Sequence, residues 1–200
     1  KYAGEPTRLT IGNKNVFREF VTLHRGTAGG GGVTSIGSNN LLMAYAHVAH
    51  DCHVGNGTIF GNAATLGGHV EVEDFVTISA YSGVHQFCRI GKYAFIGGYT
   101  VVTRDALPYA KTVGNRARIY GLNSIGLERR GFSRDLLSKL RKAYRHLIAH
   151  NTSRAIGLIQ KDPALAVPEV EYLVDFIRTA AKRGVILRRP SKKADGADDE

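Results

Sequence analysis

An apolar residue recurs at every sixth position between residues 36 and 102, and this period constrains the fold more than any other feature of the sequence. The twelve positions are Ile36, Leu42, Val48, Val54, Phe60, Leu66, Val72, Ile78, Val84, Ile90, Ile96 and Val102. The residue two places earlier is small in most of these hexads, as at Ala46, Cys52 and Ser82. Residues i and i−2 of a strand point to the same side, so each hexad is predicted to be a short strand with one large and one small inward residue. Glycine follows many of the large residues, which indicates a glycine-assisted corner after each strand.

This pattern is the hexapeptide repeat of a parallel β-helix, a mainly β fold. In this repeat class, three consecutive hexads form one triangular coil. The same period begins at Ile11, Phe17 and Leu23, but the next apolar position is Ile36, so seven extra residues lie in the segment 25–35. The segment contains four consecutive glycines, and we expect a flexible loop that leaves the coil. The loop is either a passive insertion or an element that reaches a neighbouring chain or a substrate.

The period ends after Val102, and the following residues predict a different kind of structure. Residues 108–123, with Pro108 at their start, indicate an irregular connection. We then predict a helix with Ser133 as its N-cap and its end at residues 150–151, a shorter helix at 155–160, and a third from Pro168 to Gly184. The predicted domains are a β-helix at 1–107 and a connection with a C-terminal α-helical domain at 108–187. Residues 188–200 are predicted to be a disordered tail.

The charge is concentrated in the C-terminal part of the chain. The net charge is +10, and residues 116–193 contain 18 of the 27 basic side chains with only six acidic ones. This excess of about +12 predicts the docking of an acidic partner.

The sequence contains no run of 18 apolar residues and no signal peptide, so we expect no membrane span. Cys52 and Cys88 both occupy the small inward position, two coils and about 10 Å apart, which is too far for a disulfide. Buried thiols without a disulfide favour a cytoplasmic location. The chain begins with Lys1 rather than Met, and we expect that N-terminal residues are missing from this sequence.

Six histidines precede the helical segment, and none is at an inward position. Val48, Leu66 and Val84 follow one another at intervals of three hexads and must stack on one face. The polar residues at the corner after that face are His47, His50, Asp51, Gly68, His69, His85 and Gln86, joined by His24 if the loop replaces part of a hexad. A convex corner is not a pocket, so we expect a second copy of the chain to cover it.

Two chemistries suit such a cluster. Several histidines could bind zinc as three ligands with one open position. Alternatively, one imidazole could accept a proton from a hydroxyl group, and Asp51 beside His50 could orient that imidazole. Gly68, one coil above His50, offers a backbone N–H to a developing oxyanion. We favour base catalysis over a metal site.

Four stretches now reveal a family resemblance: residues 1–7 (KYAGEPT), 46–52 (AHVAHDC), 83–87 (GVHQF) and 126–133 (GLERRGFS). Together they resemble the bacterial UDP-N-acetylglucosamine O-acyltransferases of lipid A biosynthesis, and the match covers about residues 1–187 in order. The motif at 126–133 is more diagnostic than the repeat, which unrelated activities share.

The resemblance implies a left-handed β-helix and a homotrimer with active sites between subunits. It implies transfer of an (R)-3-hydroxyacyl chain from acyl carrier protein to the 3-hydroxyl of UDP-N-acetylglucosamine, without metal or other cofactor and without nucleic acid. By motif, His50 is the general base, Asp51 its partner, and the N–H of Gly68 the oxyanion donor. The implied substrate-binding residues are His47, His69, His85 and Gln86 around the sugar and acyl chain, Asn123, Arg129 and Arg130 at the nucleotide and phosphopantetheine, and Lys1 near the phosphates.

Three alternatives remain open from the sequence. The sister enzyme of the same pathway, a UDP-3-O-acylglucosamine N-acyltransferase, shares the repeat but has a different helical end. A hexapeptide-repeat carbonic anhydrase would hold zinc with three interfacial histidines. A non-catalytic β-helical scaffold would leave the cluster of histidines and Asp51 without a role.

Overall fold

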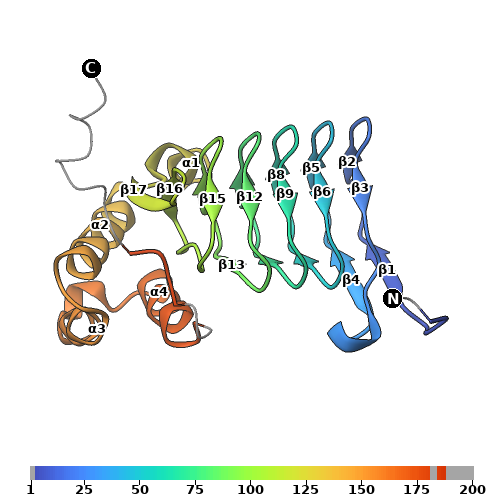
Figure 1. Cartoon of the computed structure of the whole chain (residues 1–200). Coiled ribbons are helices and arrows are strands. Elements are labelled where there is room, and N and C mark those ends of the chain that lie inside the picture. Colours follow the sequence, from blue (N-terminus) through green and yellow to red (C-terminus); the bar gives the residue numbers. More distant parts are fainter. Residues whose placement is uncertain (1–2, 181–183, 188–200) are drawn as a thin grey trace, which may run out of the picture.

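Three parallel sheets wind into a solenoid that carries a group of helices at its C-terminal end, as the computed structural model shows (Figure 1). The structure describes residues 3–180 and 184–187. Sheet A contains β1 (Arg8–Ile11), β4 (Val33–Ile36), β7 (His53–Val54), β10 (Glu71–Val72) and β13 (Arg89–Ile90). Sheet B contains β2 (Val16–Phe17), β5 (Leu41–Leu42), β8 (Ile59–Phe60), β11 (Thr77–Ile78), β14 (Phe95–Ile96), β16 (Ala110–Val113) and β17 (Arg118–Leu122). Sheet C contains β3 (Thr22–Leu23), β6 (His47–Val48), β9 (Thr65–Leu66), β12 (Gly83–Val84) and β15 (Val101–Val102).

The register of the sheets confirms the predicted parallel β-helix. Residues separated by three hexads are paired, as in the column Val48, Leu66 and Val84 of sheet C. All twelve residues of the six-residue period are buried, and none is more than 4% exposed. The small residues two places earlier are buried as well, among them Ala46, Cys52 and Ser82. Each hexad therefore contributes one large apolar and one small side chain to a continuous core.

The corners differ in detail from the prediction. The left-handed backbone conformation occurs three places after nearly every large inward residue, and there it is adopted mostly by aromatic and polar residues such as Asp51, His69 and Tyr99. The glycines directly after the large residues serve close approach instead. A Cβ atom built on Gly61 would lie 2.5 Å from the backbone nitrogen of Ala80 in the next coil. A side chain at Gly61 would therefore collide with the next coil, whereas other hexads carry residues such as Met43 and Ser79 at the equivalent position.

One coil is longer than the others. Ile11 of β1 pairs with Ile36 of β4, and Ile36 in turn pairs with Val54 of β7. Only the second of these pairs is separated by the usual three hexads. The first of these steps is seven residues longer than the second, and the extra residues lie between β3 and β4. They contain a short 3-10 helix, η1 (Ala28–Gly30). The insertion predicted at residues 25–35 is thus present, and it forms a compact turn.

The prediction of an irregular connection at residues 108–123 is wrong. Strand β16 adds to sheet B parallel to β14, and β17 turns back antiparallel to β16. The last coil is two residues short, because Phe95 pairs with Lys111 rather than with Val113, which lies three hexads after it. Ala110 and Thr112 still point inward and are fully buried. The alternation of a strand thus continues after the six-residue period has stopped, and β17 covers the end of the sheet.

Four α-helices and a 3-10 helix follow: α1 (Ser124–Glu128), α2 (Arg134–Ala149), α3 (Thr152–Lys161), η2 (Pro163–Leu165) and α4 (Pro168–Arg178). The predicted N-cap is confirmed, because the hydroxyl of Ser133 accepts a hydrogen bond from the N–H of Leu136. The predicted end of the last helix is wrong, because α4 stops at Arg178 rather than at Gly184.

The end of α4 is bound by a residue of the solenoid. The guanidinium of Arg89 donates to the carbonyl of Phe176 at 2.9 Å and to the hydroxyl of Thr179 at 3.1 Å, and it lies over the Phe176 ring. Arg89 also forms an ion pair with the buried Asp105 at 2.9 Å. An arginine from β13 thus binds a carbonyl of the last turn that the helix cannot pair itself. The sequence of the helix itself cannot predict a contact with this distant arginine.

The remaining predictions have mixed outcomes. Cys52 and Cys88 are buried and not disulfide-bonded, as expected. Among the described residues, no helix is both long and apolar enough to cross a membrane. The domain boundary at residue 107 stays a prediction, and the tail at 188–200 lies outside the described residues.

Candidate active site

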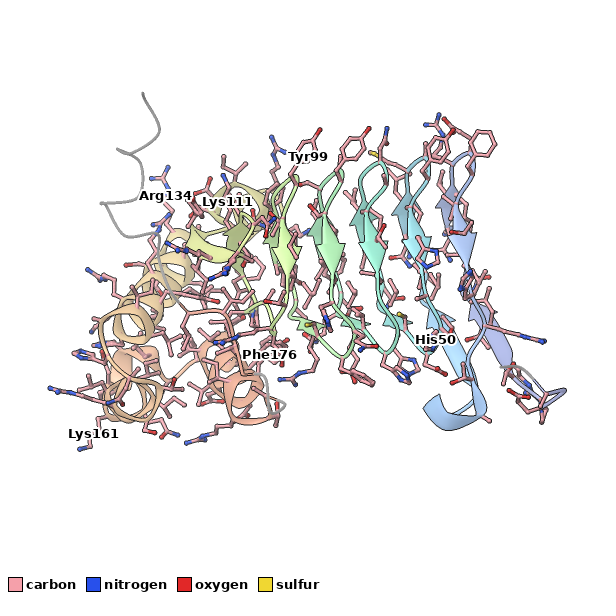
Figure 2. The ribbon with its side chains drawn as sticks, viewed as in Figure 1. His50, Tyr99, Lys111, Arg134, Lys161 and Phe176 are labelled. Carbon is pink, nitrogen blue, oxygen red and sulfur yellow. The ribbon has the colours of Figure 1, made fainter. Side chains whose placement is uncertain are left out.

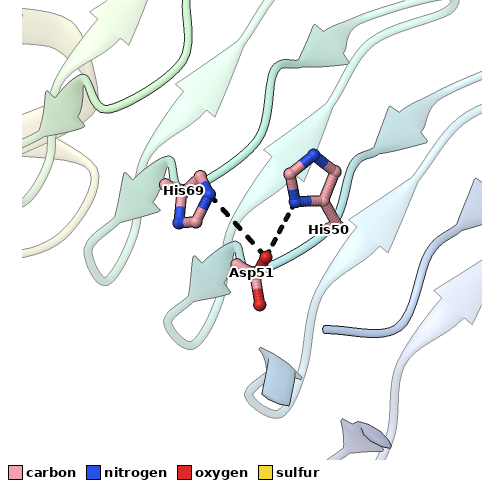
Figure 3. Close-up of side chains that lie close together, drawn as sticks. All are labelled: His50, Asp51 and His69. Atoms are coloured by element: carbon pink, nitrogen blue, oxygen red, sulfur yellow. Dashed lines mark hydrogen bonds and ion pairs between the residues drawn. The ribbon is translucent and has the colours of Figure 1, made fainter. Parts of the chain in front are cut away.

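The corner between sheets C and A brings together the residues that the sequence placed there. His50 and Asp51 lie in the turn after β6, and Gly68 and His69 lie at the equivalent turn after β9, one coil further along (Figure 3). Figure 2 shows His50 on the edge of the solenoid opposite to Tyr99. One nitrogen of His50, one of His69 and an oxygen of Asp51 lie within 4.8 Å of one another. The predicted cluster is therefore present.

Asp51 is the buried centre of this cluster. Its side chain is 0% exposed, although it stands on an outer corner. Oδ1 accepts a hydrogen bond from the N–H of Thr27 at 2.7 Å, and Oδ2 accepts one from the hydroxyl of Thr27 at 2.6 Å. The backbone N–H of Asp51 donates to the buried hydroxyl of Thr34 at 2.7 Å. The inserted turn between β3 and β4 thus encloses the carboxylate.

His50 is held on one side and open on the other. Its Nδ1 lies 2.8 Å from Oδ2 of Asp51, and an ionised carboxylate at that distance requires a proton on Nδ1. Nε2 is then the unprotonated nitrogen and has no hydrogen-bond partner among the described residues. The His50 side chain is 44% exposed, so Nε2 is accessible. This is the tautomer that a general base needs.

The ring of His50 packs against Gly68. A Cβ atom built on Gly68 would lie 2.7 Å from Cε1 and 2.9 Å from Nε2 of His50. The N–H of Gly68 donates to no other atom in the part of the chain that the structure describes. A free backbone donor therefore lies close to the free imidazole nitrogen, as oxyanion stabilisation beside a base requires.

The carboxyl group of Asp51 is held in its ionised form. Burial raises its pKa, but this effect is outweighed by the two hydrogen bonds from Thr27, the hydrogen bond from His50 and the proximity of His69, whose Nε2 lies 3.7 Å away. The net result is a pKa below the ordinary value. A permanent negative charge beside Nδ1 favours the imidazolium that forms when His50 takes up a proton.

Two further histidines flank this group. The rings of His24 and His47 are in edge-to-face contact, with centroids 4.8 Å apart, which confirms that the insertion leaves His24 at the same corner. Nδ1 of His47 bonds to the hydroxyl of Thr22 at 2.7 Å. Burial, with a smaller effect of His24, lowers the pKa of His47. His47 is therefore a neutral hydrogen-bonding group at neutral pH.

The structure also places the other candidates. His85 and Gln86 are exposed one coil beyond His69, and the ring of His69 stacks on Phe87 with centroids 4.5 Å apart. His53 lies on sheet A and bonds to Ser35 at 2.8 Å, apart from the cluster. Lys1 lies outside the described residues.

The nucleotide-binding candidates occupy a different corner of the same chain. The guanidinium of Arg130 lies 4.3 Å from the ring centroid of Phe75, at the corner between sheets A and B. Arg129 is exposed at the end of α1. The Asn123 side chain donates to the carbonyl of Tyr93, which stacks on Phe75. These residues do not approach His50 within one chain.

Thr27 is the site residue that the sequence analysis missed. The glycine-rich insertion was visible in the sequence, but nothing in the period shows that its Thr27 points at Asp51. The insertion also forms part of a hollow of about 760 Å³ with Glu5, Leu23 and residues 24–29 in its lining. One wall beside the convex corner thus comes from the chain itself.

The cluster can be compared with a metal site. Two imidazoles and a carboxylate at this spacing could hold a divalent cation. The carboxylate of Asp51, however, already accepts three hydrogen bonds, two from Thr27 and one from His50. About one of its four acceptor positions is left for an ion, and Nδ1 of His50 is already used in the pair with Asp51, so the geometry favours proton transfer.

A parallel β-helix of six-residue repeats places the chain among the hexapeptide-repeat proteins, and the matching family models identify the class as transferases. Residues 34–68 match the family model for the bacterial transferase hexapeptide, and residues 105–186 match that for domain 2 of UDP-N-acetylglucosamine O-acyltransferase. The acyl-[acyl-carrier-protein]–UDP-N-acetylglucosamine O-acyltransferase of Stenotrophomonas maltophilia (strain K279a) is 48% identical over 184 residues, which are 91% of this chain and 70% of that protein. The UDP-N-acetylglucosamine acyltransferase structure from Bacteroides fragilis aligns with a TM-score of 0.89 and 42% identity, over 92% of this chain and 72% of that one. The chain belongs to the acyl-[acyl-carrier-protein]–UDP-N-acetylglucosamine O-acyltransferase family.

The burial of Asp51 predicts a pH-dependent stability difference. Because the pKa of folded Asp51 is lowered, its ionised form stabilises the fold above the ordinary pKa of 3.8, and this contribution is lost as the pH falls through the folded-state pKa. Asp51→Asn should reduce the free energy of unfolding by about 1.5–3 kcal/mol at pH 7 and by clearly less at pH 3. Urea unfolding at both pH values measures this. The control is Asp135→Asn, which changes a 73% exposed carboxylate and should leave the free energy of unfolding nearly unchanged at either pH. If Asp51→Asn lowers the free energy of unfolding equally at pH 7 and pH 3, Asp51 is not held in its ionised form as described.

Proposed function

We propose that this protein transfers an (R)-3-hydroxyacyl chain from acyl carrier protein to the 3-hydroxyl of UDP-N-acetylglucosamine, the first step of lipid A biosynthesis. The observation that carries the proposal is the His50–Asp51 pair, with Nδ1 held at 2.8 Å and Nε2 free, in a chain of this family. The match of the O-acyltransferase model to residues 105–186 favours this reaction over the N-acyltransferase of the same pathway.

The chemistry follows from the two free groups at the corner. Nε2 of His50 removes the proton of the sugar hydroxyl as its oxygen attacks the thioester carbonyl carbon. The negative charge moves to the carbonyl oxygen, which the N–H of Gly68 stabilises. The tetrahedral intermediate then collapses and expels the phosphopantetheine thiolate, which takes up the proton from His50. Asp51 stays ionised throughout and stabilises the imidazolium.

No step of this scheme needs a metal ion or another cofactor, because the carrier's phosphopantetheine brings the acyl group. His47, His69, His85 and Gln86 are proposed to line the sugar and acyl positions, and Lys1 to lie near the phosphates. We assign the reaction to the cytoplasm, where buried thiols stay reduced.

The complete site requires more than one copy of the chain. Arg130 lies at the corner between sheets A and B, whereas His50 lies at the corner between sheets C and A. Closed symmetry would place the first corner of one chain opposite the second corner of the next. Asn123, Arg129 and Arg130 of one chain are then proposed to bind the nucleotide and phosphopantetheine beside His50 of another, in a homotrimer.

The role of His50 has a direct test. We expect His50→Ala to keep the fold and to reduce kcat/KM for acyl transfer by about 10²–10⁴-fold, the typical contribution of general base catalysis. His53→Ala is the matched control, because His53 is exposed on sheet A and should tolerate the change. A loss of less than roughly fivefold for His50→Ala would exclude that role.

The shared site predicts the oligomeric state. Light scattering of an active sample should give three times the mass of one chain, because each half of the site lies on a different copy. An active sample with the mass of a single chain would contradict the interfacial site.

The basic helical segment predicts how the carrier docks. Acyl carrier proteins are acidic, so the encounter should be electrostatically steered. Reversal of the exposed Arg134 or Arg141 to Glu should raise the KM for the carrier several-fold, because one long-range charge attraction is lost. The KM for the carrier should also depend less on the salt concentration. The KM for the nucleotide sugar should stay unchanged.

Arg18→Glu provides the control for this experiment, because Arg18 is exposed in the first coil, far from the helices. If the carrier's KM ignores both charge reversal and added salt, the basic surface serves another purpose.

A further inference from the structure

The inserted turn between β3 and β4 contacts the carboxylate of Asp51 through two of its residues. Thr27 contributes both its N–H and its hydroxyl, at 2.7 and 2.6 Å. Gly30 lies so close that a Cβ atom built on it would overlap Cγ of Asp51. A turn that contacts the carboxylate from two points controls its position.

The turn is itself firmly anchored. The N–H groups of Gly30 and Gly32 both donate to the carbonyl of Thr27, at 3.0 and 2.8 Å. The two ends of the turn are tied to β1, because Gly26 donates to the carbonyl of Arg8 and Arg8 donates to the carbonyl of Gly32. The two ends of the turn that carries Thr27 are therefore held by the solenoid through bonds that do not involve Asp51.

The comparison with the other coils shows what the turn changes. The equivalent corner residues one and two coils later are His69 and Phe87, with the same left-handed backbone as Asp51 and no insertion over them. Phe87 is 50% exposed, and the His69 side chain is 26% exposed, whereas that of Asp51 is 0% exposed. Without the turn, a carboxylate at this corner would point into water and would be free to change rotamer.

We propose that Thr27 and Gly30 are positioning residues of the catalytic pair: the hydroxyl of Thr27 fixes Oδ2 of Asp51 opposite Nδ1 of His50, and Gly30 allows the turn to close over the carboxylate. The insertion then serves to set the tautomer of His50. Oδ2 accepts from both Thr27 and His50, so its direction is determined by two donors. This inference rests on the proposed role of His50 as a base, and its spectroscopic test does not depend on turnover.

The experiment uses two matched pairs of variants. Thr27→Val keeps the shape of the side chain and removes the hydroxyl, whereas Thr27→Ser keeps the hydroxyl. Gly30→Ala places a methyl group on the Asp51 carboxylate, whereas Gly29→Ala, one residue earlier in the same turn, meets no atom within 4 Å. The left-handed backbone conformation is absent at both glycines, so the pair differs in the contact with Asp51.

Two readouts are measured on the full chain. The first is the ¹⁵N spectrum of His50, assigned by comparison with His50→Ala, which reports which ring nitrogen carries the proton. The native protein, Thr27→Ser and Gly29→Ala should show protonated Nδ1, whereas Thr27→Val and Gly30→Ala should show a mixture of tautomers. The second is acyl transfer, in which Thr27→Val and Gly30→Ala should lower kcat by about 10- to 100-fold with little change in the KM of the sugar, as expected for a lost hydrogen bond to a charged group.

The outcomes separate this inference from the proposed function. If Thr27→Val and Gly30→Ala keep the native tautomer and kcat, the positioning role is wrong, even if His50→Ala is inactive. If the tautomer changes but His50→Ala transfers the acyl group normally, the positioning role holds and the assignment of His50 as base fails. Thermal unfolding of each variant shows whether the substitution has disturbed the fold in general. If Thr27→Val or Gly30→Ala proves to be unfolded, Thr27→Ser decides the question. A folded Thr27→Ser protein that lacks the native tautomer would overturn the proposal.

Discussion

The stacking of coils at one fixed register is the constraint on which the rest of the structure depends. Each hexad places a large and a small side chain inward, and each coil of three hexads repeats this directly above the last. Residues far apart in sequence thereby become neighbours in a column on the outer surface. Asp51 and His69 are brought together because both occupy the same corner position in consecutive coils. The core thus determines the outer arrangement of chemical groups without contacting them.

A regular column is exposed, and the site arises where the regularity is broken. The repeat supplies the two histidines and the carboxylate, whereas the insertion of seven residues supplies the burial and the donors that the carboxylate needs. Carboxylates are rarely buried unless they are fully hydrogen-bonded. Thr27 meets that requirement, and its two hydrogen bonds keep Asp51 charged beside His50 despite the burial.

The sequence predicted what periodicity and local chemistry determine, and it failed where distant segments meet. The inward residues, the corner of His50 and the Ser133 cap follow from spacing within a few residues. The end of α4 is bound by Arg89, which is 87 residues away from the carbonyl that it contacts. The contact of Thr27 with Asp51 depends on how the insertion folds back, and β16 depends on a coil that is two residues short. None of these has a local signature.

The positions of the basic helices and of His50 bear on how a carrier-bound donor would reach the site. The basic helices lie at one end of the solenoid, and His50 lies several coils away toward the other, near the blue end of the ribbon in Figure 1 and labelled in Figure 2. Sheet C needs three steps from β6 to β15, which amount to about 14 Å at the usual strand spacing. Within one chain, a carrier docked on the helices would therefore have to span this distance to place its acyl group at His50. A thioester on phosphopantetheine is an extended arm that could span it, which agrees with the proposed acyl donor.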